Sequence, residues 1–251
     1  MSEPVIIFDS VSKSYPLYHH ITGGIKNFLF HFPNAVSQLK NHKYEALHKI
    51  SFQVYRGETF GIIGRNGAGK STALGLIAGV LKPSEGRIAV KGRVSALLEL
   101  GSGFNGELTG RENIVLNGVL LGLTRSAVMS KMDEIIAFSG LGDFVDQPLR
   151  TYSTGMMMRL GFSVVASLNP EILLIDEVFA VGDMEFQKKC MDKLESFKKS
   201  GVTIVYVSHG LKTILQACDR VVWIEDHRVR MLGDAREVVN SYAGAGQLKL
   251  E

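Results

Sequence analysis

The chain is 251 residues long, with a formal net charge of +3, 45% hydrophobic residues and 21% charged residues. These values are typical of a globular protein with a substantial core, and they exclude wholesale disorder. The charge is too small to indicate nucleic-acid binding by itself, and no apolar run approaches the roughly 18 residues of a membrane span. Glycine is the outlier, because its 27 residues are about 11% of the chain, against the roughly 7% usual in proteins, and we expect these glycines to mark special turns.

The cysteines and the first residues favour a cytoplasmic protein. Cys190 and Cys218 are the only cysteines and lack C-x-x-C spacing, which suits a reducing compartment and no structural disulfide. The first residues lack the basic head and the apolar stretch of a signal peptide. We therefore expect a soluble protein of the cytoplasm.

The first third of the chain alternates strands with turns. Hydrophobic periodicity predicts a helix over 74–81 and three short strands, at 5–8, 50–54 and 59–63. Between the first two strands, residues 10–49 carry five lysines, one acidic residue and five of the seven histidines. This basic segment is predicted to be an insertion.

The middle of the chain is predicted to be almost entirely helical, from 109 to 168, with Ser126 as a helix N-cap. Strand patterns return afterwards, and helical patterns lie between and after them: strands at 172–175, at 202–207 and around Trp223 and Val229, and helices over 184–200 and 235–242. Strands that alternate with helices predict an α/β fold with a mainly parallel sheet, interrupted by a helical insertion.

A glycine-rich loop follows the strand predicted over 59–63. Its pattern is G-x-x-x-x-G-K-S, in which glycines let successive N–H groups point at phosphate oxygens and the helix start adds its positive dipole end. Lys70 is expected to reach the β- and γ-phosphates of a nucleotide, and the Ser71 hydroxyl to ligate Mg²⁺. The predicted nucleotide-binding residues of this loop are Gly64, Arg65, Asn66, Gly67, Ala68, Gly69, Lys70, Ser71 and Thr72.

Two acidic residues follow the apolar run at 172–175. Asp176 ends the predicted strand, and a buried strand that brings it beside Ser71 completes an oxygen ligand set for Mg²⁺. Glu177 is suited to polarise an attacking water as the catalytic carboxylate. The two motifs together predict one nucleotide site.

A third motif lies in the helical region before Asp176. Tyr152-Ser153-Thr154-Gly155-Met156 stands where the ATP-binding subunits of ABC transporters have their L-S-G-G-Q signature, and the whole chain resembles that family. Ser153 and Gly155 match the signature, whereas Thr154 and Met156 differ from its commonest form. The resemblance implies that Ser153, Thr154 and Gly155 bind a γ-phosphate, because a hydroxyl and a helix N-terminus are kept.

The same resemblance assigns four further residues. Asp183 lies in the D-loop position, and His209 matches the switch histidine, which implies a catalytic contact with the γ-phosphate. Tyr15 matches the aromatic side chain that stacks on adenine, with Tyr44 as a rival because the insertion separates the two. Glu99 stands where the family has a glutamine, which implies contact with Mg²⁺ or its water, and it adds negative charge near the phosphates.

The resemblance implies a P-loop ATPase of the ABC type in a single domain over 1–251. Its core sheet is expected to be mainly parallel, with an N-terminal antiparallel β part and an inserted helical subdomain at about 100–168 that includes the glutamine-loop position. Two copies are implied to enclose each ATP, the phosphate loop of one facing the signature of the other. Glu177→Gln is then expected to trap an ATP-bound dimer.

A narrower resemblance concerns what is transported. The run over 97–114 is similar to that of the ATPases of bacterial polysaccharide exporters. This implies a homodimer with two polytopic permease subunits at the cytoplasmic face of the bacterial inner membrane, exporting a lipid-linked O-antigen polysaccharide. Teichoic acid or another polysaccharide is the alternative. The chain ends soon after 235–242, so we expect no C-terminal glycan-binding domain and polymer recognition by the permease.

The basic segment contains apolar residues at helical spacing over 21–32, typical of a short amphipathic helix. Three interpretations stay open: packing on the core, contact with the permease or lipid head groups, and metal binding by histidines, although no i, i+4 histidine pair is present. By analogy with the insertion of the exporter ATPases, we expect deletion of 21–32 to impair export more than ATP hydrolysis.

Other classes of nucleotide-binding protein fit less well. A soluble ABC-type ATPase acting on nucleic acid or ribosomes usually has two nucleotide domains or a long coiled coil, and this sequence shows neither. A GTPase is disfavoured because no N-K-x-D motif occurs. The basicity of the chain resides in residues 10–50, which favours a membrane-side surface over a nucleic-acid groove.

Overall fold

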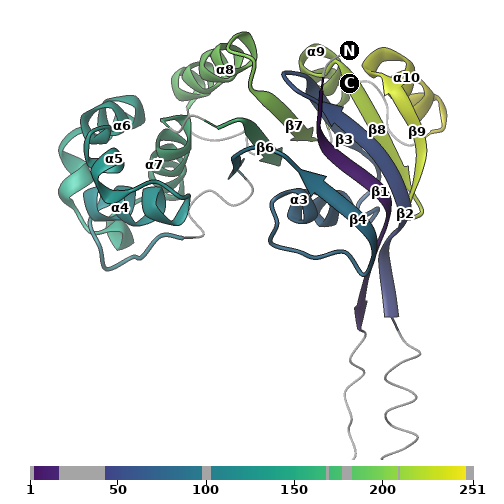
Figure 1. The fold of residues 1–251 in the computed structure, drawn as a ribbon. Helices are drawn as coiled ribbons and strands as arrows, with labels where there is room; N and C mark the ends of the chain where they lie inside the picture. Colours follow the sequence, from purple (N-terminus) through teal and green to yellow (C-terminus); the bar gives the residue numbers. More distant parts are fainter. Residues whose placement is uncertain are drawn as a thin grey trace, which may run out of the picture.

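The computed structural model describes residues 3–16, 43–97, 103–167, 170–176, 183–208 and 210–246. Two lobes are visible in Figure 1, one built on β-sheets and one built of helices. The described part of the chain contains no helix that is long and apolar enough to cross a membrane.

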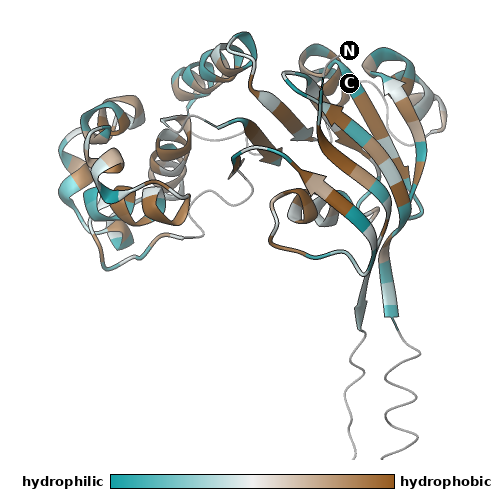
Figure 2. Ribbon diagram, viewed as in Figure 1, coloured by the Kyte–Doolittle hydropathy of each residue, from teal (hydrophilic) through white to brown (hydrophobic). Residues whose placement is uncertain are grey.

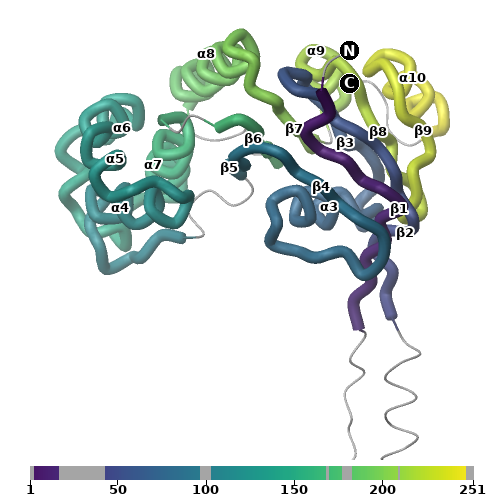
Figure 3. The backbone as a smooth tube through the Cα atoms, in the orientation of Figure 1, coloured from purple at the N-terminus to yellow at the C-terminus, as the bar shows by residue number. Residues whose placement is uncertain are grey.

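A six-stranded sheet forms the centre of the larger lobe. Its strands follow the order β5, β6, β7, β3, β8, β9, and all neighbours are parallel except β8 and β9. Their bounds are β3 Thr59–Ile63, β5 Val94–Leu97, β6 Ile172–Asp176, β7 Thr203–Val207, β8 Arg220–Glu225 and β9 Arg228–Asp234. Figure 3 shows β5 and β6 side by side, and the predicted, mainly parallel sheet is confirmed.

Both faces of this sheet are covered, which explains the continuous apolar runs of its strands. All five residues of β3 and of β7 are buried, and Figure 2 shows the inner strands as mostly hydrophobic. Successive residues alternate between two clusters: Ile204 and Tyr206 of β7 join one, whereas Val205 and Val207 join the other. A residue's position along a strand therefore decides on which face of the sheet its side chain packs.

A second sheet of three antiparallel strands packs on one face of the first. Its order is β2, β1, β4, with bounds β1 Pro4–Pro16, β2 Lys43–Tyr55 and β4 Glu85–Val90. β1 and β2 are much longer than predicted, because residues 10–16 and 43–49 pair with each other, for example Lys13 with Leu47. Residues 17–42, including the helix predicted over 21–32, lie outside the described residues.

The helical lobe matches the helices predicted between 109 and 168. It contains α4 Gly110–Leu120, α5 Arg125–Met129, α6 Met132–Ser139, two short 3₁₀ helices at Gly142–Asp146 and Leu149–Thr151, and α7 Thr154–Ala166. The lobe has its own buried cluster, which includes Ile114, Ile135 and Leu160. The predicted N-cap Ser126 is wrong: Thr124 caps α5 and accepts a hydrogen bond from the N–H of Ala127, because the helix begins two residues earlier.

The remaining helices cover the two faces of the central sheet. α3 Lys70–Ile77 packs on the side of the antiparallel sheet. The other face carries α8 Met184–Lys199, α9 Leu211–Ala217 and α10 Ala235–Gly244. Cys190 and Cys218 are free and buried on this second face, where desolvation raises the pKa of each thiol to about 12.

Two threonines begin neighbouring buried strands but differ in hydrogen bonding. Thr203 Oγ1 accepts a hydrogen bond of 2.9 Å from the N–H of Gly57. Thr59 is 2% exposed, and its Oγ1 has no partner among the residues that the structure describes. A buried hydroxyl without a partner costs about 1–3 kcal/mol.

We therefore expect Thr59→Val to raise the free energy of unfolding by about 1 kcal/mol, because valine keeps the shape and removes the unpaired hydroxyl. Thr203→Val is the matched control and should lower this free energy by about 1–3 kcal/mol, since it leaves the N–H of Gly57 without an acceptor. Urea denaturation at constant m-value measures both changes. A destabilising Thr59→Val would contradict the unpaired state of the hydroxyl.

Candidate functional site

The predicted phosphate loop joins β3 to α3, as the motif requires. Two of its glycines are held so closely that a side chain would collide with backbone. A Cβ at Gly64 would lie 2.2 Å from the carbonyl oxygen of Ile224, and one at Gly69 would lie 2.3 Å from that of Ala46. Gly69 also has φ +106°, which other residues rarely adopt, and it is the N-cap of α3. The glycines therefore set the curl of the loop.

Lys70 begins α3 and lies within the curl of the loop. Its side chain is buried, and its ammonium donates hydrogen bonds to the carbonyls of Gly64 at 2.8 Å and Arg65 at 3.0 Å. These bonds hold the positive charge at the mouth of the loop, next to the N-terminus of α3. Both groups favour an anion at this point.

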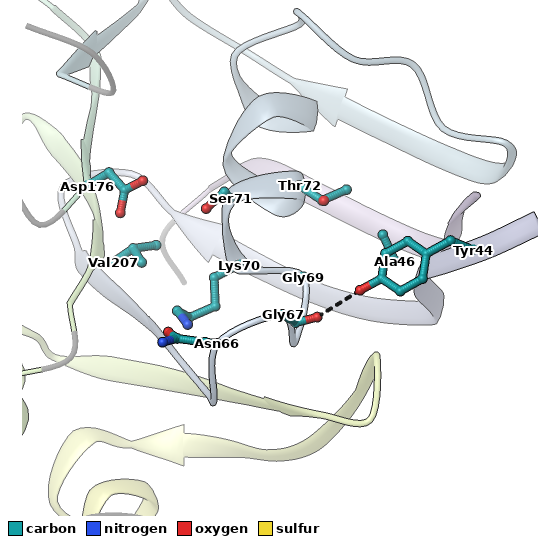
Figure 4. A pocket seen from close by; sticks show the side chains of 10 residues that line it. All are labelled: Tyr44, Ala46, Asn66, Gly67, Gly69, Lys70, Ser71, Thr72, Asp176 and Val207. Atoms are coloured by element: carbon teal, nitrogen blue, oxygen red, sulfur yellow. Dashed lines mark hydrogen bonds between the residues drawn. The ribbon is translucent and has the colours of Figure 1, made fainter. Parts of the chain in front are cut away.

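The loop borders a cavity of about 270 Å³. Figure 4 shows the ten residues that line it: Tyr44, Ala46, Asn66, Gly67, Gly69, Lys70, Ser71, Thr72, Asp176 and Val207. Six of the nine predicted loop residues are among these, and Gly64, Arg65 and Ala68 do not line the cavity. Ala46 and Val207 were not predicted, because small apolar residues carry no motif signal.

The prediction that Asp176 lies near Ser71 is supported by the structure, since both line this cavity although 105 positions separate them in the sequence. β6 ends at Asp176, two strands away from β3, so the sheet order brings the carboxylate to the edge where the loop lies. A hydroxyl and a carboxylate are oxygen ligands of the kind that Mg²⁺ prefers. These two residues fit the predicted metal site.

The two tyrosines proposed for adenine stacking occupy different positions. They are register partners on β1 and β2, and only Tyr44 lines the cavity. The Tyr44 hydroxyl donates a 3.2 Å hydrogen bond to the carbonyl of Gly67, and its ring meets the His227 ring edge-on at 5.6 Å. Tyr15 lies beneath the ammonium of Lys13 instead. The geometry favours Tyr44.

The signature residues lie in the helical lobe, away from the cavity. Ser153 is the N-cap of α7, where its side chain accepts a 3.2 Å hydrogen bond from the N–H of Met156. Ser153 and Thr154 are exposed, and neither they nor Gly155 line the nucleotide cavity. One copy of the chain therefore does not bring signature and phosphate loop together.

Asp183 also lies outside the cavity lining. Its carboxylate caps α8 by accepting a 2.9 Å hydrogen bond from the N–H of Phe186, and it forms an ion pair with Arg159 of α7. The hydrogen bond from Phe186 is the main cause that lowers the pKa of Asp183, and the nearby Arg159 adds to it. This pair ties the signature helix to the start of α8.

Three predicted residues, Glu99, Glu177 and His209, lie outside the described residues. Each follows within two positions the end of a strand, β5, β6 and β7 respectively. These three strands are adjacent and parallel, so their carboxyl ends share one edge of the sheet. The histidines proposed as metal ligands also fall outside, and the described residues contain no group of three or more histidine, cysteine, aspartate or glutamate side chains placed to hold a metal ion.

Comparisons with known proteins agree with this geometry. The model of the ABC transporter family matches residues 47–180. The O-antigen export system ATP-binding protein RfbB of Klebsiella pneumoniae is 56% identical over 243 residues, which cover 97% of this chain and 99% of that protein. The teichoic acids export ATP-binding protein TagH of Bacillus anthracis is 43% identical over 94% of this chain and 42% of its own length.

Solved structures show the same fold. An ATP-binding cassette whose dimeric, post-hydrolysis structure holds ADP and Pi superimposes with a TM-score of 0.72 at 19% identity, covering 92% of this chain and 99% of that one. The family model matches more than half of the chain. The matched region includes the phosphate loop with its close-packed glycines, the strand that ends at Asp176 and the inserted helical lobe. The chain belongs to the ABC transporter family of ATP-binding proteins.

Proposed function

We propose that this chain is the ATP-binding and ATP-hydrolysing subunit of a bacterial exporter that moves a lipid-linked O-antigen polysaccharide across the inner membrane. The observation that carries the proposal is the 56% identity to an O-antigen export ATP-binding protein over nearly the full length of both chains. The teichoic acid relative is less similar and extends well beyond the matched region, so export of teichoic acid is the second candidate.

Each described site residue has a chemical task in this proposal. The N–H groups of the loop and the ammonium of Lys70 hold the phosphates and neutralise their charge. Ser71 and Asp176 would hold Mg²⁺, which screens phosphate charge when bound. Two residues outside the described part of the chain are assigned by the resemblance: Glu177, next to Asp176, to orient the attacking water, and His209 to contact the γ-phosphate.

A second copy of the chain completes the site. Ser153 and Thr154 are exposed at the start of α7 and do not line their own nucleotide cavity, so they are available to the ATP of a partner. Closure of such a dimer depends on the γ-phosphate, and hydrolysis releases it. Asp183 would support this contact indirectly, through Arg159 of the signature helix.

The permease is the expected membrane partner. Large apolar side chains are exposed on the helical lobe, namely Val119, Leu120, Met129 and Phe144. They offer a surface for a membrane protein, which would hold this chain at the cytoplasmic face of the membrane. We propose two copies of each subunit in the complex.

Tyr44 is proposed to stack on the adenine ring. We expect Tyr44→Ala to weaken ATP binding by about 5- to 150-fold, the range that loss of a base–aromatic stack produces. Tyr15→Ala is the matched control and should change the Kd by less than about twofold. Isothermal titration of both variants with a non-hydrolysable ATP analogue measures the effect, and an equal loss in both would contradict the assignment.

Deletion of the gene tests the function as a whole. Cells that lack the protein should lose O-antigen from their surface and accumulate the lipid-linked polymer inside. The unchanged chain should restore export, and the Lys70→Ala chain should not. Loss of a phosphate-rich teichoic polymer instead would favour the second candidate, and a chain that purifies with ribosomes or nucleic acid would overturn both.

A further inference from the structure

A second cavity of about 450 Å³ lies on the face of the central sheet opposite α3. Its floor is formed by strand residues, among them Thr59 of β3 and Tyr206 of β7. One wall is α8, with Met191 and Leu194, and the other is the end of α9, with Ala217. Figure 1 shows α8 and α9 on either side of β7. This volume is within the usual range for small-molecule sites.

The two cavities are separated only by the sheet. On β6, Ile175 lines the second cavity and the next residue, Asp176, lines the nucleotide cavity. On β7 the same holds for Tyr206 and Val207. Successive side chains of a strand point to opposite faces, so one strand carries contacts of both sites. A ligand in the second cavity therefore touches the strands that position Asp176.

One polar group in the second cavity lacks a partner. The backbone of Thr59 is satisfied, since its N–H donates to the Asp219 carboxylate and its carbonyl accepts from the Asp219 N–H, both at 2.8 Å. Its buried Oγ1 has no partner among the described residues. A buried hydroxyl that is left unpaired calls for an explanation, and a ligand with a hydrogen-bonding group would satisfy it.

The charged side chains beside the cavity indicate what kind of ligand fits. Lys198 pairs with Asp219 at 3.3 Å, and Glu195 pairs with Lys199 at 2.9 Å. Lys198 and Glu195 are already neutralised in these pairs, and the third charged lining residue, Asp192, is exposed, so solvent screens its charge and a charged ligand would gain little. The apolar floor and walls instead favour an apolar body.

We propose that this cavity binds a small neutral amphiphile whose apolar body packs against Ile175, Leu194 and Tyr206 and whose single hydroxyl bonds to Thr59. Nothing in the nucleotide site takes part in this contact. Occupancy is further proposed to alter the ATPase rate through β6 and β7. This second part rests on the proposed function, whereas the binding itself does not.

The binding is tested with two probes, 4-methylphenol and toluene, which differ only in the hydroxyl that the first carries. Two-dimensional amide NMR of the full chain gives both Kd values. In Thr59→Val, the ratio of the toluene Kd to the 4-methylphenol Kd should fall about three- to tenfold, because one neutral hydrogen bond contributes about that factor to affinity. In Thr59→Ser, which keeps the hydroxyl, the ratio should stay as in the wild type. An unchanged ratio in Thr59→Val would overturn the assignment.

A second variant tests whether the probes bind in this cavity, independently of any indirect effect that a substitution of Thr59 has on the structure. Ala217→Leu fills the cavity from the α9 side and should weaken both probes at least fivefold, with their ratio unchanged. Binding of both probes at wild-type strength in Ala217→Leu would place them elsewhere and refute the site.

The coupling is tested by ATPase assays with saturating 4-methylphenol. We expect the wild-type rate to change at least twofold and the basal rate of Thr59→Val to equal that of wild type, with a smaller response to the probe. Binding without any change in rate would refute the coupling alone. An inactive wild-type chain would instead contradict the proposed function, and the NMR result would still decide the cavity.

Discussion

Replacing Lys70 with alanine is expected to lower the ATPase rate by about 100-fold or more and to abolish export. The ammonium lies within the curl of the phosphate loop, held by the carbonyls of Gly64 and Arg65, and it is the only lysine that lines the nucleotide cavity among the described residues. Its removal takes away the positive charge that we expect to meet the β- and γ-phosphates. Steady-state phosphate release at saturating ATP measures the rate.

Lys82→Ala is the matched control for this change. Lys82 lies in the exposed turn after α3 and does not line the cavity, so its loss should leave the rate within about twofold of wild type. Both variants should unfold at similar temperatures, because the loop carbonyls freed in Lys70→Ala face a cavity that water can enter. A Lys70→Ala protein that is folded and hydrolyses ATP normally would contradict the site.

Replacing Glu177 with glutamine is expected to trap an ATP-bound dimer. The amide keeps the size of the side chain but cannot take a proton from water, so hydrolysis should slow by about 10²- to 10⁴-fold while binding persists. Size-exclusion chromatography with light scattering in ATP and Mg²⁺ should show a stable dimer for the variant and mainly monomer for the wild type.

Glu171→Gln, at the opposite end of β6, is the matched control. Glu171 lies just before β6 and pairs with Arg93 at 3.4 Å, at the end remote from the nucleotide cavity. Its variant should behave as wild type in both assays. A Glu177→Gln protein that stays monomeric and hydrolyses ATP normally would refute both the catalytic role and the dimer mechanism.

Local sequence patterns predicted an element correctly where its structure depends mainly on its own residues. The strand at 59–63 and the phosphate loop were predicted with their observed bounds, because a buried β-branched run and a glycine-lysine motif are contiguous signals. Shorter or partly exposed elements were missed. β4 is half exposed at a sheet edge, β5 has four residues and α9 has seven, too few for a clear period.

Long-range pairing explains the other differences. β1 and β2 extend to Pro16 and Lys43 because each strand satisfies the other's backbone, although their polar ends show no strand pattern. The same pairing places Tyr44 against Gly67, and nothing in the sequence around either residue indicates that contact. The resemblance favours Tyr15 for stacking on adenine, whereas the geometry of the cavity favours Tyr44.

The sequence by itself determined the chemistry of this protein: a phosphate loop, a pair of acids, a signature and the α/β order that carries them. Each of these features is recognisable from residues that are neighbours in the sequence, because the curl of a loop and the burial of a strand depend mainly on local residues. Only the tertiary structure decided that Asp176 and Ser71 line one cavity, that the signature residues do not line that cavity, and that a second cavity with the unpaired Thr59 hydroxyl lies against β6 and β7. These depend on the order and register of strands far apart in the chain, which no local pattern specifies.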